Sequence, residues 1–236
     1  MNETPTFVHG SWHGPWCWEP LQAGLAKRGF ASHAPALPSC GADAARLKGL
    51  AEDAETVAGA AATIKSDVIV VGHSYGGAVI SEAAHPDNVR QLVFIGAFMP
   101  DIGRPFPSYF PPGPLPAYVV LNDDGSYSAA DAEAESAFYH DCAPEIASAS
   151  RKKLVRQSQS VMSYAPTRAA WRAIPSHYIV LTQDRIVPPF MQRDFAKQAG
   201  SVSEMPTSHS PMLSRPADLA EQLAAIAGRG RISAAA

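Results

Sequence analysis

The chain has 236 residues, of which 46% are hydrophobic, and a formal net charge of −3 at pH 7. This length and composition predict one α/β domain with a sizeable core, and the charge argues against nucleic acid or an anionic membrane surface as a partner. The three widely spaced cysteines indicate reduced thiols rather than a disulfide framework or a zinc site. Because a basic leader and a long apolar run are both absent, we expect a cytoplasmic protein.

The first loop of the chain carries glycine next to polar side chains. A short strand over residues 6–9 runs into His9-Gly10-Ser11-Trp12-His13, and a helix follows from about Pro15. Glycine lets a backbone approach a ligand closely, so we interpret this loop as half of an oxyanion hole, with the N–H of Ser11 as one donor. The alternative is a tight turn that anchors the helix. His13 either orients the loop or lines a substrate pocket.

Residues 30–64 contain predicted structural elements and no predicted catalytic residue. Residues 30–35 predict a second strand, and the alanine-rich residues 43–64 predict one or two helices. Within that helical segment we interpret Glu52, Asp53 and Glu55 as an exposed acidic face, because nothing nearby indicates a cleft.

The stretch from Val68 to Ile80 holds the strongest motif. An apolar, β-branched run predicts a buried parallel strand, which breaks at Gly72-His73-Ser74-Tyr75-Gly76 before a helix resumes. In a G-x-S-x-G turn of this kind the serine sits on a strained strand-to-helix corner, and the N–H of the next residue faces the same site. Ser74 is therefore the predicted nucleophile and Tyr75 the second oxyanion donor, whereas the alternative is a buried turn without chemistry.

After a strand over residues 91–96 the composition changes. Residues 102–116 are rich in proline and aromatic side chains, which neither a helix nor a central strand accommodates. We predict an inserted cap over residues 102–172, with a hairpin near 118–127 and helices over 129–139 and 144–155. Caps control access to a site, so aromatic residues in or beside this one are candidates for substrate binding: Phe98, Tyr109, Phe138 and Trp171.

The second half of the core supplies two further polar residues. Asp184 follows a β-rich run over residues 176–182, and His209 follows a last short strand over 201–205. Catalytic groups gather at the carboxyl ends of parallel strands, and the order Ser74, Asp184, His209 is that of an α/β-hydrolase triad. His209 would take the proton of Ser74 while Asp184 holds the imidazole, and this chemistry needs no cofactor and no metal.

These elements divide the chain into an α/β core over residues 1–101 and 173–228, the cap between its halves, and a flexible tail over 229–236.

Five motifs resemble the plant methylesterase and hydroxynitrile lyase branch of the α/β-hydrolases, with its bacterial esterase relatives. They are His9 to Trp18, Gly72 to Gly77, Ala97 to Asp101, Tyr178 to Pro188, and His209 to Pro216. The resemblance implies an α/β-hydrolase fold, a mostly parallel sheet flanked by helices, and the same triad and oxyanion donors. The family's lyases carry threonine in place of Gly10 and lysine in place of Ser210, so the resemblance favours ester hydrolysis.

We therefore predict a serine carboxylic-ester hydrolase that acts through an acyl-enzyme on a small to medium, largely apolar ester or lactone. One alternative is cyanohydrin cleavage of the hydroxynitrile lyase type. The other is a catalytically idle hydrolase fold that serves as a receptor for a small ligand. The oligomeric state stays open between monomer and homodimer.

Overall fold

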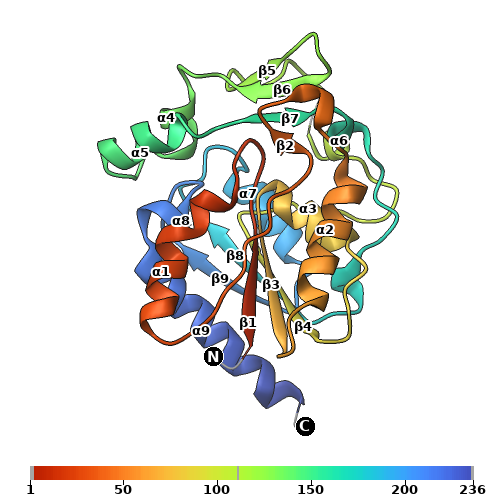
Figure 1. Cartoon of the computed structure of the whole chain (residues 1–236), viewed down its shortest axis with the longest axis vertical. Coiled ribbons are helices and arrows are strands. Elements are labelled where there is room, and N and C mark those ends of the chain that lie inside the picture. The colour runs from red at the N-terminus through yellow and green to blue at the C-terminus, as the bar shows by residue number, and fades with distance from the viewer. Residues whose placement is uncertain (1–2, 111, 235–236) are drawn as a thin grey trace.

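The core of the protein is a parallel sheet of five strands. The computed structural model describes residues 3–110 and 112–234. The strands lie in the order β1 (Thr4–Val8), β3 (Val68–His73), β4 (Val89–Ile95), β8 (Ser176–Leu181) and β9 (Ser201–Met205), and all neighbours are parallel (Figure 1). Every residue of β3 and β8 is buried, which explains why residues 68–71 and 178–181 are apolar runs instead of alternating patterns.

Helices cover both faces of this sheet, so the predicted fold class is confirmed. Figure 1 shows α1 (Glu19–Lys27), α8 (Pro211–Ser214) and α9 (Pro216–Ala234) on one side, and α2 (Leu50–Ala62) and α3 (Tyr75–Glu82) on the other. The remaining core helix, α7 (Pro189–Ala196), packs against β8. Two 3-10 turns, η1 (Pro15–Trp18) and η2 (Ala44–Arg46), precede α1 and α2. None of the described helices is long and apolar enough to cross a membrane.

A cap lies over one end of the core, opposite the N-terminus (Figure 1). It contains an antiparallel sheet in the order β2 (Cys40–Gly41), β7 (Arg156–Ser158), β6 (Ser126–Ala129) and β5 (Val119–Leu121). Its short helices are η3 (Phe106–Tyr109), α4 (Ala134–Phe138), α5 (Pro144–Arg151), α6 (Ser160–Ser163) and η4 (Ala170–Arg172). Because β2 precedes the predicted cap by some sixty residues in the chain, the cap sheet joins two distant segments.

Three predicted elements differ in the structure. The helix expected over residues 129–139 is shorter, because β6 extends to residue 129 and α4 covers only residues 134–138. The strand expected over residues 30–35 reduces to one bridge between Thr6 and His33, because prolines follow at once and cannot donate to a ladder. The helix expected to reach residue 155 ends at Arg151, and the N–H of Val155 donates instead to Trp12 O at 2.8 Å.

Helix α9 continues to Ala234, and residues 235–236 lie outside the described chain. The flexible tail over residues 229–236 stays a prediction.

Candidate active site

Ser74 stands on a strained corner between β3 and α3. Its backbone has φ 54° and ψ −122°, a conformation that costs a non-glycine residue on the order of 1–3 kcal/mol. The chain packs so closely here that a Cβ on Gly72 would lie 2.7 Å from Gly76 O, and one on Gly76 would lie 2.4 Å from Val8 O. The two glycines of the motif are therefore required by packing, and they let β3 turn sharply enough to present the Ser74 side chain.

His209 and Asp184 form a buried pair beyond the ends of β9 and β8. His209 Nδ1 lies 2.8 Å from Asp184 Oδ2, and the two side chains are 3% and 0% exposed. Asp184 also accepts hydrogen bonds from the N–H groups of Ile186 (2.7 Å) and Val187 (3.1 Å) and from Gln192 Nε2 (2.9 Å). These hydrogen bonds hold the Asp184 carboxylate in place. The carboxylate in turn orients the His209 ring, so that Nδ1–H donates to Asp184 and Nε2 is left to accept a proton.

Two further side chains hold the loop that carries His209. Burial lowers the pKa of His73 well below its usual value, so this ring is neutral, and its Nε2 lies 2.7 Å from His209 O. Asp141, in the cap, accepts from both the N–H of Ser208 (2.9 Å) and the Ser208 hydroxyl. The nucleophile turn and the cap therefore both brace the histidine loop, and neither contact has a signal in the sequence.

The first loop presents its N–H groups beside Ser74. Trp12 has φ 62°, and His13 Nδ1 lies 2.7 Å from Ser11 O. Burial lowers the pKa of His13 to about 3, so the neutral ring donates from Nδ1 and accepts at Nε2 from the Tyr139 hydroxyl, 2.8 Å away. Within the described residues, the N–H groups of Ser11 and Tyr75 have no protein acceptor. Both are therefore free to bind a ligand oxygen.

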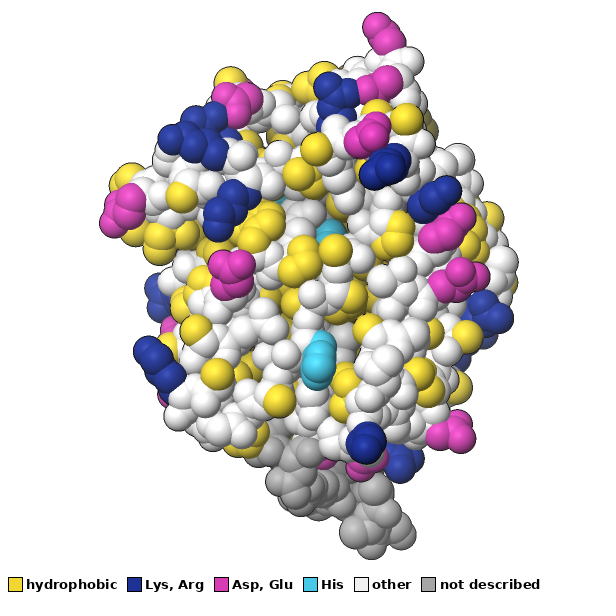
Figure 2. Space-filling model, in the orientation of Figure 1, with side chains coloured by type: hydrophobic (Ala, Val, Ile, Leu, Met, Phe, Trp, Pro, Cys, Tyr) yellow, Lys and Arg dark blue, Asp and Glu magenta, His cyan; other side chains and the backbone are white. Residues whose placement is uncertain are grey.

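A cavity of about 580 Å³ opens beside the first loop and the nucleophile turn. Ser11, Ser74 and His209 lie in its wall, and so do three predicted substrate-binding residues, His13, Phe98 and Phe138. The rest of the lining is largely aromatic, aliphatic and proline side chains: Trp12, Phe106, Pro107, Phe110, Pro112, Gly113, Pro114, Leu115, Pro116, Tyr118, Val119, Tyr127, Met162 and Ile186. Among these described lining residues there is no Asp, Glu, Lys or Arg. Figure 2 likewise shows hydrophobic side chains gathered near the centre of one face and charged ones around its periphery.

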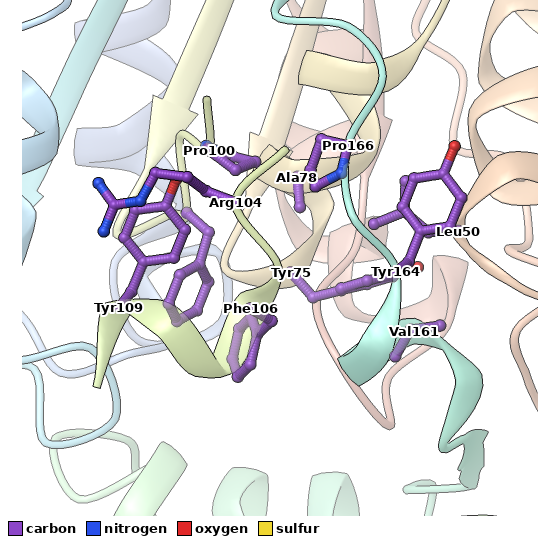
Figure 3. A pocket seen from close by; sticks show the side chains of 11 residues that line it. Leu50, Tyr75, Ala78, Pro100, Arg104, Phe106, Tyr109, Val161, Tyr164 and Pro166 are labelled. Atoms are coloured by element: carbon purple, nitrogen blue, oxygen red, sulfur yellow. The ribbon is translucent and has the colours of Figure 1, made fainter. Parts of the chain in front are cut away.

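Tyr109 and Trp171 were expected in this cavity but lie elsewhere. Tyr109 lines a separate pocket of about 10 Å³ beside Arg104 and Phe106, with room for about one water molecule (Figure 3). Its hydroxyl accepts from Asp101 N–H at 2.9 Å, and Trp171 Nε1 donates to Pro100 O at 2.9 Å. The two aromatic side chains therefore bind the two ends of the cap to residues 100–101 of the core.

The interpretation of Asp53 as an exposed residue is wrong. Its side chain is buried, because α2 packs against α3 and turns this carboxylate inward. It accepts from Ser39 N–H at 2.8 Å and from the Tyr75 hydroxyl at 2.6 Å. The alanine-rich surroundings of Asp53 hid its position, since helical periodicity alone does not say which face meets a neighbour.

No three His, Cys, Asp or Glu side chains are grouped to hold a metal ion in the described part of the chain. The site instead assembles Ser11, Ser74 and a histidine paired with a carboxylate around a largely apolar cavity. Such an arrangement can carry out nucleophilic acyl chemistry.

Comparison with known proteins places this chain in a family. The model of the Alpha/beta hydrolase family matches residues 7–222. The Carbendazim hydrolyzing esterase of Nocardioides sp. (strain SG-4G) is 31% identical over 239 residues, covering 93% of this chain and 97% of that protein. Norfluorocurarine synthase 2 of Strychnos nux-vomica is 30% identical over 260 residues, covering 93% of each.

The solved structure of a pyrethroid hydrolase from Sphingobium faniae JZ-2 superposes with a TM-score of 0.81 at 24% identity, covering 96% of this chain and 97% of that one. This similarity confirms the fold. Since the relatives include both an esterase and a synthase, the chemistry of this chain must be argued from its own site.

Proposed function

The chain belongs to the Alpha/beta hydrolase family, and we propose that it is a serine carboxylic-ester hydrolase that acts through an acyl-enzyme on a neutral, largely apolar ester or lactone. The observation that carries the proposal is the convergence of Ser74, the paired His209 and Ser11 on one cavity whose described lining holds no Asp, Glu, Lys or Arg. The N–H groups of Ser11 and Tyr75, the residue after the serine, have no protein acceptor among the described residues, which supports their role as oxyanion donors. The relative named as a carbendazim hydrolyzing esterase, which matches nearly the whole chain, supports the same reaction.

In the proposed mechanism Ser74 Oγ attacks the acyl carbon and passes its proton to His209 Nε2. Asp184 stabilises the imidazolium that forms. The negative charge on the former carbonyl oxygen is bound by the N–H groups of Ser11 and Tyr75, each worth about 10²–10³ in rate. His209 then gives its proton to the leaving alcohol, and water attacks the acyl-enzyme by the same route in reverse.

The cavity sets the class of substrate. At about 580 Å³ it falls within the range of about 300–1,000 Å³ that suits a drug-sized ligand. A charged acyl group would lose its water there without gaining an ionic partner from the lining residues. We therefore assign an ester whose acyl and alcohol parts are both uncharged, with aromatic walls favouring flat or ring-containing groups.

Two positions disfavour cyanohydrin cleavage, which in this branch is associated with threonine and lysine where the chain has Gly10 and Ser210. A Cβ on Gly10 would lie 2.8 Å from Ser74 Cβ, so a threonine does not fit beside the serine as it stands. Ser210 is uncharged and buried, and it offers no positive charge to a departing cyanide.

The test is turnover of p-nitrophenyl butyrate and of mandelonitrile by the wild type and by Ser74→Ala. We expect ester hydrolysis with an initial burst of p-nitrophenol, lost at least 10³-fold in the variant, and no cleavage of mandelonitrile. Ester turnover that survives in Ser74→Ala, or mandelonitrile cleavage that exceeds it, would overturn the proposal. If neither compound is turned over by the folded wild type, the enzyme assignment fails in favour of a ligand receptor.

A further inference from the structure

A set of hydrogen bonds connects the two residues that supply the free N–H groups, and it runs through side chains except at Ser39, whose backbone N–H makes one link and whose hydroxyl makes the next. We call it the Asp53 network, and it consists of Tyr75, Asp53, Ser39, Gln157, Tyr127 and Ser11, in that order. The two hydrogen bonds to Asp53 are described above. The other three join Gln157 Nε2 to Ser39 Oγ (3.1 Å), the Tyr127 hydroxyl to Gln157 Oε1 (2.6 Å) and Ser11 Oγ to the Tyr127 oxygen (3.3 Å). The network therefore starts and ends at the oxyanion donors, although it crosses both the core and the cap.

The direction of each hydrogen bond follows from the number of hydrogens available. Tyr127 has one hydroxyl hydrogen, which it gives to Gln157 Oε1, so Ser11 must donate to the Tyr127 oxygen. Tyr75 likewise gives its one hydrogen to Asp53 Oδ2, while Ser39 N–H donates to Oδ1. Asp53 is the terminal acceptor of the network, and it accepts one hydrogen bond at each of its two carboxylate oxygens.

Burying this carboxylate works against folding. Ser39, Asp53 and Gln157 are fully buried, and Tyr75 and Tyr127 nearly so. The hydrogen-bond partners of Asp53 are a peptide N–H and a phenol, neither of which carries a positive charge. Burial accordingly raises the pKa of Asp53 to about 6. The two hydrogen bonds that Asp53 accepts offset part of this cost and hold the Ser39 N–H and the Tyr75 hydroxyl in place.

We propose that Asp53 is a positioning residue of the oxyanion hole, which through the Tyr75 phenol and the Ser39 loop fixes the N–H groups of Tyr75 and Ser11 at the spacing that a tetrahedral oxyanion requires. The inference rests on the proposed ester hydrolysis. Tyr75 is held by its hydroxyl, which donates to Asp53 on α2, while its N–H directly follows Ser74 and has no protein acceptor among the described residues. Ser11 is held through Tyr127, whose ring also packs on Trp12 at 5.2 Å between centroids.

The groups that face Asp53 are themselves electrically neutral, with one exception. Tyr75 from α3 and Tyr127 from β6 have pKa values raised by burial, and burial raises the pKa of Cys40 in β2 to about 12, so all three stay protonated at neutral pH. The exception is Glu52 on α2 itself, which acts on Asp53 through its charge while its carboxylate accepts from Gly49 N–H at 3.0 Å.

The experiment compares Asp53→Asn and Tyr75→Phe with the wild type, using p-nitrophenyl butyrate as substrate. Two inhibitors report on the site: an aryl trifluoromethyl ketone, which adds to the serine and forms an oxyanion, and the matching methyl ketone, which binds without forming one. Glu82→Gln is the matched control. Glu82 is also a buried carboxylate next to the sheet, but it accepts from Tyr164, Thr167 and Arg168, far along α3 from the cavity.

We expect kcat to fall about tenfold or more in both network variants, with KM within about twofold, because the oxyanion hole acts on the transition state. The affinity for the trifluoromethyl ketone should fall by the same factor, and that for the methyl ketone should not change. Glu82→Gln should leave kcat and both affinities as in the wild type.

The proposal is overturned if folded Tyr75→Phe keeps kcat within about twofold of the wild type, if both ketones weaken equally, or if Glu82→Gln shows the same loss. Tyr75→Phe keeps the test decisive even if Asp53→Asn fails to fold, since it removes one hydroxyl only. A failure of the esterase assignment is distinguished by a different result, namely ester turnover that persists in Ser74→Ala.

Discussion

Buried neutral histidines make the stability of this protein dependent on pH in a way that one substitution can isolate. Burial lowers the pKa of His9 to about 4 and that of His13 to about 3, against an ordinary value of 6.5. In the unfolded chain each of these rings takes up a proton near pH 6.5, whereas in the folded protein neither does. These two rings therefore leave the free energy of unfolding unchanged above pH 6.5. They lower it as the pH falls from 6.5 toward 4 for His9 and toward 3 for His13.

The size of the effect follows from linkage. Between pH 6.5 and 5 the unfolded state binds one more proton at each ring, and each proton lowers the free energy of unfolding by about 1.4 kcal/mol per pH unit. Each histidine thus accounts for a loss of about 2 kcal/mol at pH 5, and the two together for about 4 kcal/mol. Asp53 acts in the opposite sense, because its pKa is raised to about 6, and it restores about 1.4 kcal/mol between pH 6 and 5.

Urea unfolding at several pH values between 7.5 and 5 would measure how the free energy of unfolding depends on pH for the wild type, His9→Gln and His33→Gln. In His9→Gln the glutamine oxygen can still accept from Leu37 N–H, as His9 Nε2 does at 3.3 Å. Between pH 6.5 and 5 we expect His9→Gln to lose about 2 kcal/mol less of its free energy of unfolding than the wild type loses. This difference does not depend on the stability of the variant at pH 7.5. His33 is exposed and controls for the substitution itself. Parallel pH curves for His9→Gln and the wild type would refute the argument.

Three further outcomes concern activity. Gly10→Ala should lower kcat/KM for p-nitrophenyl butyrate about 10²-fold, because its Cβ would meet Ser74 Cβ at 2.8 Å; unchanged kinetics would show that the serine relaxes freely. Asp184→Asn should lower kcat about 10³–10⁴-fold with little change in KM, and a loss below tenfold would remove the carboxylate from the mechanism. Phe138→Ala enlarges the cavity and should shift the preference toward bulkier esters in a chain-length series, whereas a uniform loss across the series would indicate damage to the His209 loop instead.

The sequence predicts the parts of the site that depend on local pattern. Ser74 is found from its own turn, because glycine spacing and the flanking strand and helix are all within a few residues. Asp184 and His209 are found because each follows a strand, and the carboxyl ends of parallel strands share one edge of the sheet. Their approach to 2.8 Å is then a consequence of topology.

The residues that sequence reasoning missed act over long separations. Tyr139 reaches His13, Asp141 reaches Ser208, and Asp53 reaches Tyr75, and each contact joins elements that no local pattern relates. The direction of a side chain is equally hard to predict in an irregular segment. Tyr109 and Trp171 sit in or beside the cap as expected, yet they turn toward the backbone of residues 100–101 and away from the cavity.

The central claim is that Ser74 is a nucleophile activated by His209. Its most direct test is mass spectrometry of the intact and digested protein after treatment with a fluorophosphonate, for the wild type, Ser74→Ala and His209→Gln. We predict one adduct, on the peptide that holds Ser74, absent in Ser74→Ala and formed at least about 10²-fold more slowly in His209→Gln. An adduct on another residue, or equal labelling rates in the wild type and His209→Gln, would contradict the account.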